Sequence, residues 1–150
     1  MSHILYKTHN IQFYLDESVP CLVNEWCGFI KSEDFRAAIL KLVDILKQQK
    51  TTYPTLSMLA DTRTLGALTR TDLEWVTTEI NPLYVGAGVT HEAFLLSQNA
   101  FGNSALNRYT KQTTTNGIFT VQLFDDMEKA KAWLKAEMTD QSVHSDQWIN

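Results

Sequence analysis

The chain has 150 residues, of which 44% are hydrophobic and 20% are charged. This length suits one compact domain with its own hydrophobic core, and the composition is too apolar for a disordered chain. Thirteen lysines and arginines against seventeen acidic residues give a net charge of −4, which argues against a general nucleic-acid-binding protein.

The sequence indicates a cytoplasmic protein without a transmembrane segment. No stretch approaches the roughly 20 apolar residues that span a membrane, and the first residues lack the pattern of a secretory signal. Cys21 and Cys27 lie on one expected strand, where their separation in sequence places the Cα atoms about 20 Å apart. We therefore expect no disulfide between them and interpret both as small buried side chains.

The first part of the chain predicts a β-hairpin followed by a long helix. Apolar and polar residues alternate at 11–15, and a second extended stretch occupies 21–26, so the two should pair antiparallel. Apolar residues then recur at helical spacing over 35–46, and Ser32 is the expected cap of that helix.

The middle of the chain predicts two further strands with a helix between them. A short apolar strand at 55–60 ends at Asp61, and the sequence TDLE at 71–74 has the pattern of a capping box that opens a helix. Pro82 kinks or ends this helix, and the apolar run at 93–96 is typical of a strand covered on both faces.

The last part predicts a short helix at 104–111, a strand at 118–124, a final helix that begins after 125–126, and a polar tail at 139–150. The order of elements indicates a single α/β domain over 1–150, with its core at about 10–138. We expect a mixed sheet of about five strands and about four helices. The opening antiparallel hairpin should be followed by parallel βα units.

Three familiar motifs are incomplete in this sequence. Gly86-Ala87-Gly88 lacks the third glycine of a dinucleotide-binding loop and precedes a strand, so we expect no such cofactor. The histidines and cysteines show no metal-ligand spacing, and we expect no metal site. Ser104 begins a partial nucleophile elbow that has a leucine where the second glycine belongs. A hydrolase with His91 and Asp61 as distant helpers is therefore the least favoured function.

Arginines are concentrated after the ends of the expected strands. In open α/β sheets ligands bind beyond the carboxyl ends of the strands, and arginine matches phosphate and carboxylate groups. The candidate anion site consists of cationic and hydroxyl side chains in these connections: Arg63, Arg70, Arg108, Lys111, Thr62 and Ser104. The alternative is that these are solvated loop charges without a ligand.

Three segments carry a family resemblance. The expected strand that leads through 26–28 into the long helix is the first, and the strand at 56–61, followed by a helix with Trp75, is the second. The third is the ending FDDMEKAKAWL at 124–134. Over about residues 10–138 the chain resembles the SpoIIAA-like group of the STAS superfamily, which is also described as STAS/SEC14-like.

The resemblance implies a small bacterial regulatory or protein-interaction module without catalysis. The SEC14-like comparison implies, as the alternative, a carrier of a small anionic ligand or lipid. Relatives that antagonise anti-sigma factors carry a phosphorylatable Ser or Thr at the start of the second helix. Here that stretch offers Thr69 and Thr71, but it lacks the usual Asp-Ser pair and the following glycine. An exposed edge strand of the hairpin would also permit a homodimer.

Overall fold

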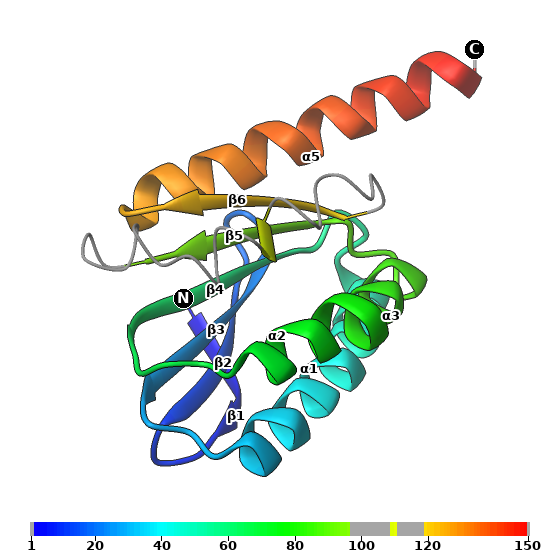
Figure 1. The fold of residues 1–150 in the computed structure, drawn as a ribbon. Helices are drawn as coiled ribbons and strands as arrows, with labels where there is room; N and C mark the ends of the chain where they lie inside the picture. The colour runs from blue at the N-terminus through cyan, green and yellow to red at the C-terminus, as the bar shows by residue number, and fades with distance from the viewer. Residues whose placement is uncertain (1, 97–108, 111–118, 150) are drawn as a thin grey trace.

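A computed structural model describes residues 2–96, 109–110 and 119–149, with the backbone alone at 2 and 140–149. In these residues the chain forms a six-stranded sheet with helices on both faces (Figure 1). The strand order is β1-β2-β3-β4-β5-β6, so each strand lies beside the one that precedes it in the chain. The expected mixed α/β fold is confirmed.

An antiparallel meander forms the first half of the sheet. It consists of β1 (Ser2–Lys7), β2 (Ile11–Asp16) and β3 (Cys21–Gly28). The predicted hairpin of β2 and β3 is present, but β1 was not predicted because the residues ILY at 4–6 do not alternate in polarity. β1 therefore adds an edge strand outside the hairpin.

The second half of the sheet is parallel. It consists of β4 (Ser57–Leu65), β5 (His91–Leu95) and β6 (Thr120–Phe124). β4 pairs in parallel with β3, β5 with β4, and β6 with β5. These strands match the expected parallel units.

The helices lie in two layers around the sheet. One face carries α1 (Ser32–Thr52), α2 (Arg70–Trp75), the π-helical turn η1 (Val76–Ile80) and α3 (Asn81–Gly86), and the other carries α5 (Met127–Ile149) (Figure 1). Fully buried Phe13 and Leu42 belong to the larger core under α1, and Ala93 and Leu134 belong to the smaller core under α5.

The starts of the first two helices differ from the sequence prediction. Ser32 is the first residue of α1 and donates its hydroxyl to Asp72 Oδ1 at 2.6 Å instead of capping its own helix. The cap of α2 is Thr69, whose Oγ1 accepts from the Asp72 backbone N–H at 3.1 Å, so Thr71 lies inside the first turn. The sequence prediction placed Asp72 in a capping box within its own helix. In the structure its carboxylate instead links α2 to α1 through Ser32 and Arg36.

Two further expectations need correction. Cys21 is buried as expected, but Cys27 is exposed because the pairing of β3 with β4 shifts between Glu25 and Cys27. The residues expected as a polar tail continue α5 as far as Ile149, and the helix extends beyond the sheet (Figure 1).

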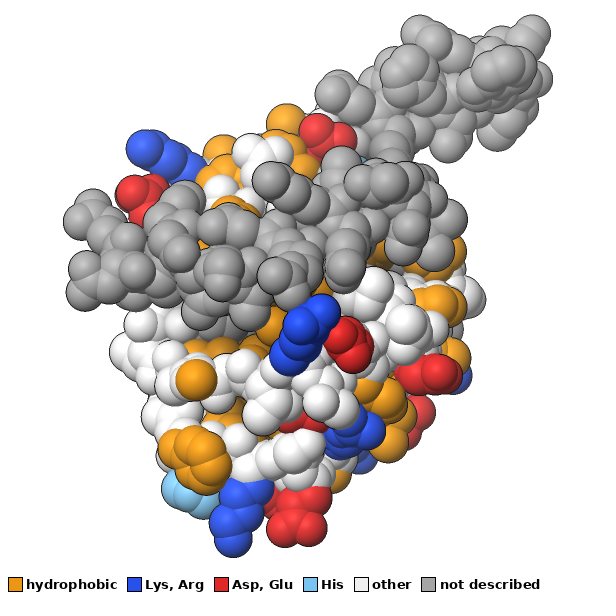
Figure 2. All heavy atoms as spheres, in the orientation of Figure 1, with side chains coloured by type: hydrophobic (Ala, Val, Ile, Leu, Met, Phe, Trp, Pro, Cys, Tyr) orange, Lys and Arg blue, Asp and Glu red, His pale blue; other side chains and the backbone are white. Residues whose placement is uncertain are grey.

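The described residues show no helix that could span a membrane, and the face drawn in Figure 2 is not dominated by one sign of charge. Among the residues that were placed, no helix is long and apolar enough to cross a bilayer. On the face in Figure 2, acidic and basic side chains lie interspersed rather than gathered by sign.

Candidate functional site

The structure does not assemble the predicted anion site from the residues it describes. Arg63 lies within β4, and its guanidinium contacts the Asp61 carboxylate at 2.9 and 3.1 Å. Arg70 pairs with Glu74 at 3.1 Å on the exposed surface of α2. Both cations therefore already have a carboxylate partner. Three predicted site residues lie outside the described residues: Arg108, Lys111 and Ser104. Of the helix expected at 104–111, the structure describes residues 109–110 alone.

The two predicted phosphorylation sites are both exposed at the start of α2. The Thr69 hydroxyl is engaged as the helix cap, and Thr71 follows it in the first turn. Both side chains are accessible to a kinase, and phosphorylation of Thr69 or Thr71 stays a prediction.

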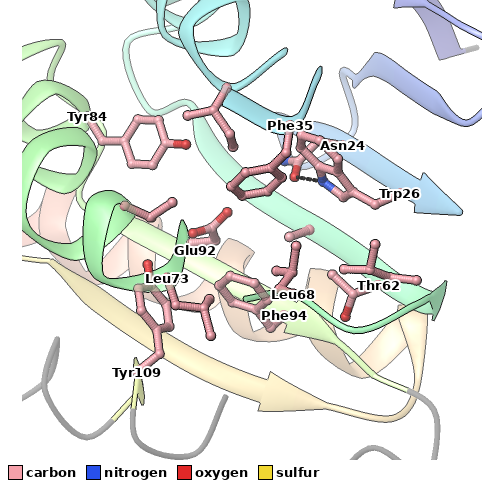
Figure 3. A pocket seen from close by; sticks show the side chains of 14 residues that line it. Asn24, Trp26, Phe35, Thr62, Leu68, Leu73, Tyr84, Glu92, Phe94 and Tyr109 are labelled. Carbon is pink, nitrogen blue, oxygen red and sulfur yellow. Dashed lines mark hydrogen bonds between the residues drawn. The ribbon is translucent and has the colours of Figure 1, made fainter. Parts of the chain in front are cut away.

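A pocket lies between the sheet and the helices on the α1 side (Figure 3). The cavity itself has a volume of about 40 Å³, and the empty space between its lining atoms, which includes open solvent, amounts to about 450 Å³. Its walls combine aromatic, aliphatic and a few polar side chains: Asn24, Trp26, Phe35, Ile39, Ala60, Thr62, Leu65, Leu68, Leu73, Val76, Tyr84, Glu92, Phe94 and Tyr109. Of the predicted site residues that the structure describes, Thr62 lines this pocket.

The floor of the pocket follows from the alternation of side chains along three strands. Ala60 and Thr62 of β4 face the pocket, whereas Asp61 and Arg63 point to the opposite face of the sheet. The same alternation places Glu92 of β5 on the floor, with Phe94 two positions further on.

The segment Arg70–Gly86, which we call the roof, covers this floor with α2, η1 and α3. Leu73, Val76 and Tyr84 come from its three successive pieces. A π-helical turn inserts an extra residue into a helix, and such turns are frequent at functional sites. The widened turn of this helix thus lies over the pocket.

A polar cluster fastens the roof to α1. Arg36 Nε contacts Asp72 Oδ1 at 2.9 Å, and the guanidinium lies 4.8 Å from the centre of the Trp75 ring. Burial favours a raised pKa for Asp72, but hydrogen bonds from Ser32 and Arg36 outweigh it and leave the pKa below its usual value. The ionised Asp72 therefore links the two helices that border the pocket.

Two of the polar side chains in the lining are satisfied by the protein itself. Asn24 Oδ1 accepts from Trp26 Nε1 at 2.8 Å, and Asn24 Nδ2 donates to the Leu59 carbonyl at 3.3 Å. Thr62 donates to the Leu95 carbonyl at 3.0 Å. These hydrogen bonds hold both side chains in place and use the hydroxyl proton of Thr62 and one donor and one acceptor site of Asn24.

Glu92 and Tyr84 differ from the other polar groups of the pocket. Their exposed fractions are 4% and 2%, and within the described part of the chain neither side chain makes a hydrogen bond. Burial raises the pKa of Glu92 to about 8. Burial, followed by the nearby Glu92 and Tyr109, raises the pKa of Tyr84 well above its ordinary value. Figure 3 shows the Tyr84 hydroxyl and the Glu92 carboxyl directed into the same space.

Sequence reasoning missed both residues. The strand was expected to begin at Ala93, so the acidic residue one position earlier was left in a connection. The available signal was a carboxyl at an inward position of a strand that is covered on both faces, because carboxyls are rarely buried without a partner. Tyr84 lies beyond Pro82, where the helix was expected to kink or end.

Comparison with known proteins gives a structural likeness and no match in sequence. No protein-family model matches the chain, and no curated protein matches it. The crystal structure of an uncharacterized DUF3478-family protein with a SpoIIAA-like fold, from Shewanella loihica PV-4, superposes with a TM-score of 0.58. The match has 15% sequence identity and covers 88% of this chain and 99% of that one. The chain therefore has a SpoIIAA-like fold.

Proposed function

We propose that the chain is a non-enzymatic binding domain that holds a small, mostly apolar molecule in the pocket beneath the roof. The pocket itself carries this proposal, because it is concave, lies between two layers and has predominantly aromatic and aliphatic walls. We keep the cytoplasmic location expected from the sequence as part of the proposal.

The charges of the lining favour a neutral ligand over an anion. Among the described lining residues, the titratable side chains are Glu92, Tyr84 and Tyr109, and none of the residues is a lysine or arginine. A bound phosphate or carboxylate would therefore lack a counter-charge inside the pocket. The anion-carrier alternative is accordingly replaced by a carrier or sensor of an uncharged molecule.

Native mass spectrometry of the protein, purified gently from its own host, tests this function. We expect a retained small molecule, and we expect Ala60→Leu to reduce its occupancy because the larger side chain fills the floor of the pocket. The matched control is Ala37→Leu, which adds the same atoms to the exposed face of α1. Equal occupancy in the two variants would show that the molecule binds elsewhere and would refute the assignment of the pocket.

Regulation through a protein partner is the second candidate, and one surface residue favours it. The side chain of Phe29, directly after β3, is 77% exposed. It lies where the chain after β3 meets the chain after β4, since Gly66 donates its N–H to the Gly28 carbonyl at 2.9 Å. A partner that binds the wild-type protein and Ala60→Leu, but not Phe29→Ser, would support this role. Equal binding by Phe29→Ser would exclude this surface.

A further inference from the structure

Glu92 and Tyr84 are buried polar groups that the described protein leaves without hydrogen bonds. A buried polar group without a partner is costly, and native structures usually supply one. Both groups line the same pocket, and Figure 3 shows their oxygens directed into it from opposite layers, one from β5 and the other from α3. Their missing partner is therefore expected on the bound molecule.

We propose that the molecule in this pocket carries an uncharged carbonyl oxygen, to which the Glu92 carboxyl and the Tyr84 hydroxyl both donate hydrogen bonds. The inference rests on the proposed binding function and names the chemistry that the pocket selects. The class comprises mostly apolar ketones, aldehydes, esters and amides.

The protonation states of the two groups make both of them donors. With its pKa raised to about 8 by burial, Glu92 is mainly a neutral carboxylic acid at pH 7, and this form carries an O–H donor. Tyr84, with its pKa raised further above neutrality, keeps its phenolic proton. A carbonyl oxygen has two lone pairs and can accept from both.

Charged ligands fit the same geometry less well. A carboxylate would meet no cation among the described lining residues, and raising the pH would place a second negative charge beside it. An ammonium group would have to bring a full charge between Phe35, Val76 and Phe94, which replace its hydration with hydrocarbon. A carbonyl satisfies both donors without burying a net charge.

Three probes with the same carbon skeleton separate the alternatives: acetophenone, ethylbenzene and 1-phenylethylamine. They present a carbonyl, no polar atom and an ammonium group, respectively. Binding is measured at pH 6.5 by titration of the isotopically labelled full chain, observed by NMR. We expect acetophenone to bind about tenfold more tightly than ethylbenzene, as two modest hydrogen bonds allow, and more tightly than the amine.

Variants assign the preference to the two donors. Tyr84→Phe and Glu92→Leu should each lower the ratio of ketone to hydrocarbon affinity several-fold while ethylbenzene still binds. Tyr109→Phe is the matched control, because that hydroxyl lines the pocket but already donates to Asn81 Oδ1 at 3.2 Å. When the ketone carries a ¹³C-labelled carbonyl, its carbonyl resonance should move downfield on binding to the wild type and to Tyr109→Phe, as hydrogen-bonded carbonyls do. This downfield shift should be smaller in Tyr84→Phe and in Glu92→Leu.

Each outcome decides between the two proposals. If acetophenone and ethylbenzene bind equally, or if the amine binds best, the carbonyl inference is overturned and the pocket function stands. If no probe shifts the resonances of the lining residues, the binding function falls and the inference falls with it. Loss of the ketone preference at pH 9, where Glu92 loses its proton, supports the inference. An unchanged preference at that pH, together with an unchanged ratio in Glu92→Leu, removes Glu92 from the site.

Discussion

Glu92→Gln should remove a pH dependence of stability that the buried carboxyl imposes on this domain. The folded chain holds the pKa of Glu92 at about 8, whereas the unfolded chain releases the proton near the ordinary value of 4.5. The folded state therefore binds more protons between these two values, and the free energy of unfolding falls as the pH rises from about 4.5 to about 8.

The size of the effect follows from the difference between the pKa of about 8 in the folded chain and the ordinary value of 4.5. At 1.36 kcal/mol per unit, retention of the proton costs the folded state about 1 kcal/mol at pH 5 and about 3 kcal/mol at pH 7. The difference in free energy of unfolding between wild type and Glu92→Gln should thus change by about 2 kcal/mol over this interval, in favour of the variant at higher pH.

Urea unfolding at pH 5, 6, 7 and 8, followed by circular dichroism, measures this difference. A change of about 2 kcal/mol moves the midpoint by roughly 1 M urea for a domain of this size. Glu79→Gln removes an exposed carboxylate from the roof and is the matched control, which should follow the wild type. If Glu92→Gln also follows the wild type at every pH, then Glu92 is ionised in the folded protein and the reasoning about its burial is wrong.

Three further substitutions test other parts of the structure. Arg36→Met leaves the buried Asp72 carboxylate without its cation and should lower the free energy of unfolding by about 1–2 kcal/mol, a modest cost because the guanidinium is partly exposed. Thermal unfolding measures this loss of stability, and an unchanged melting temperature would show that the pair does not hold the roof in place. Lys131→Met breaks the 2.7 Å contact with Asp16 between α5 and β2 and should lower the free energy of unfolding by less than about 1 kcal/mol at pH 7. This cost should vanish as the pH falls through about 2, because the lowered pKa of Asp16 stabilises the fold only above that range. Urea titrations at pH 2 and 7 test this, and an equal cost at both values would assign the effect to packing. Leu134→Ala removes a fully buried side chain between α5 and the sheet and should cost about 2–5 kcal/mol in urea unfolding, whereas a loss under 1 kcal/mol would mean that α5 is loosely packed.

Much of the fold could be predicted because local patterns and tertiary packing agree. The helix at 35–46 and the hairpin of β2 and β3 have apolar periodicities that match the faces they bury. β1 was missed because an edge strand buries little, and its pattern is correspondingly weak. The caps were misplaced for a different reason. The partner of Asp72 lies on α1, 36 positions earlier in the chain, and no local pattern contains that contact.

The candidate site was predicted poorly because it depends on which face each side chain takes. The arginines after the strands suggested an anion site, yet Arg63 points away from the face that α1 covers and contacts Asp61 on its own strand. Thr62, its neighbour, points into the pocket. One position of register thus separates a lining residue from a residue on the other side of the sheet. The pocket also needs the roof to pass over Glu92, which the spacing of residues in sequence does not reveal.

The order of the strands has a consequence for how the domain is made. Because β1 to β6 follow one another across the sheet as they do along the chain, each strand can pair with a neighbour that has already left the ribosome. Among these six strands, none has to insert between two that are already paired. The sheet can therefore grow from one edge during synthesis, and α5, the last element, covers the second face only after β5 and β6 have been added.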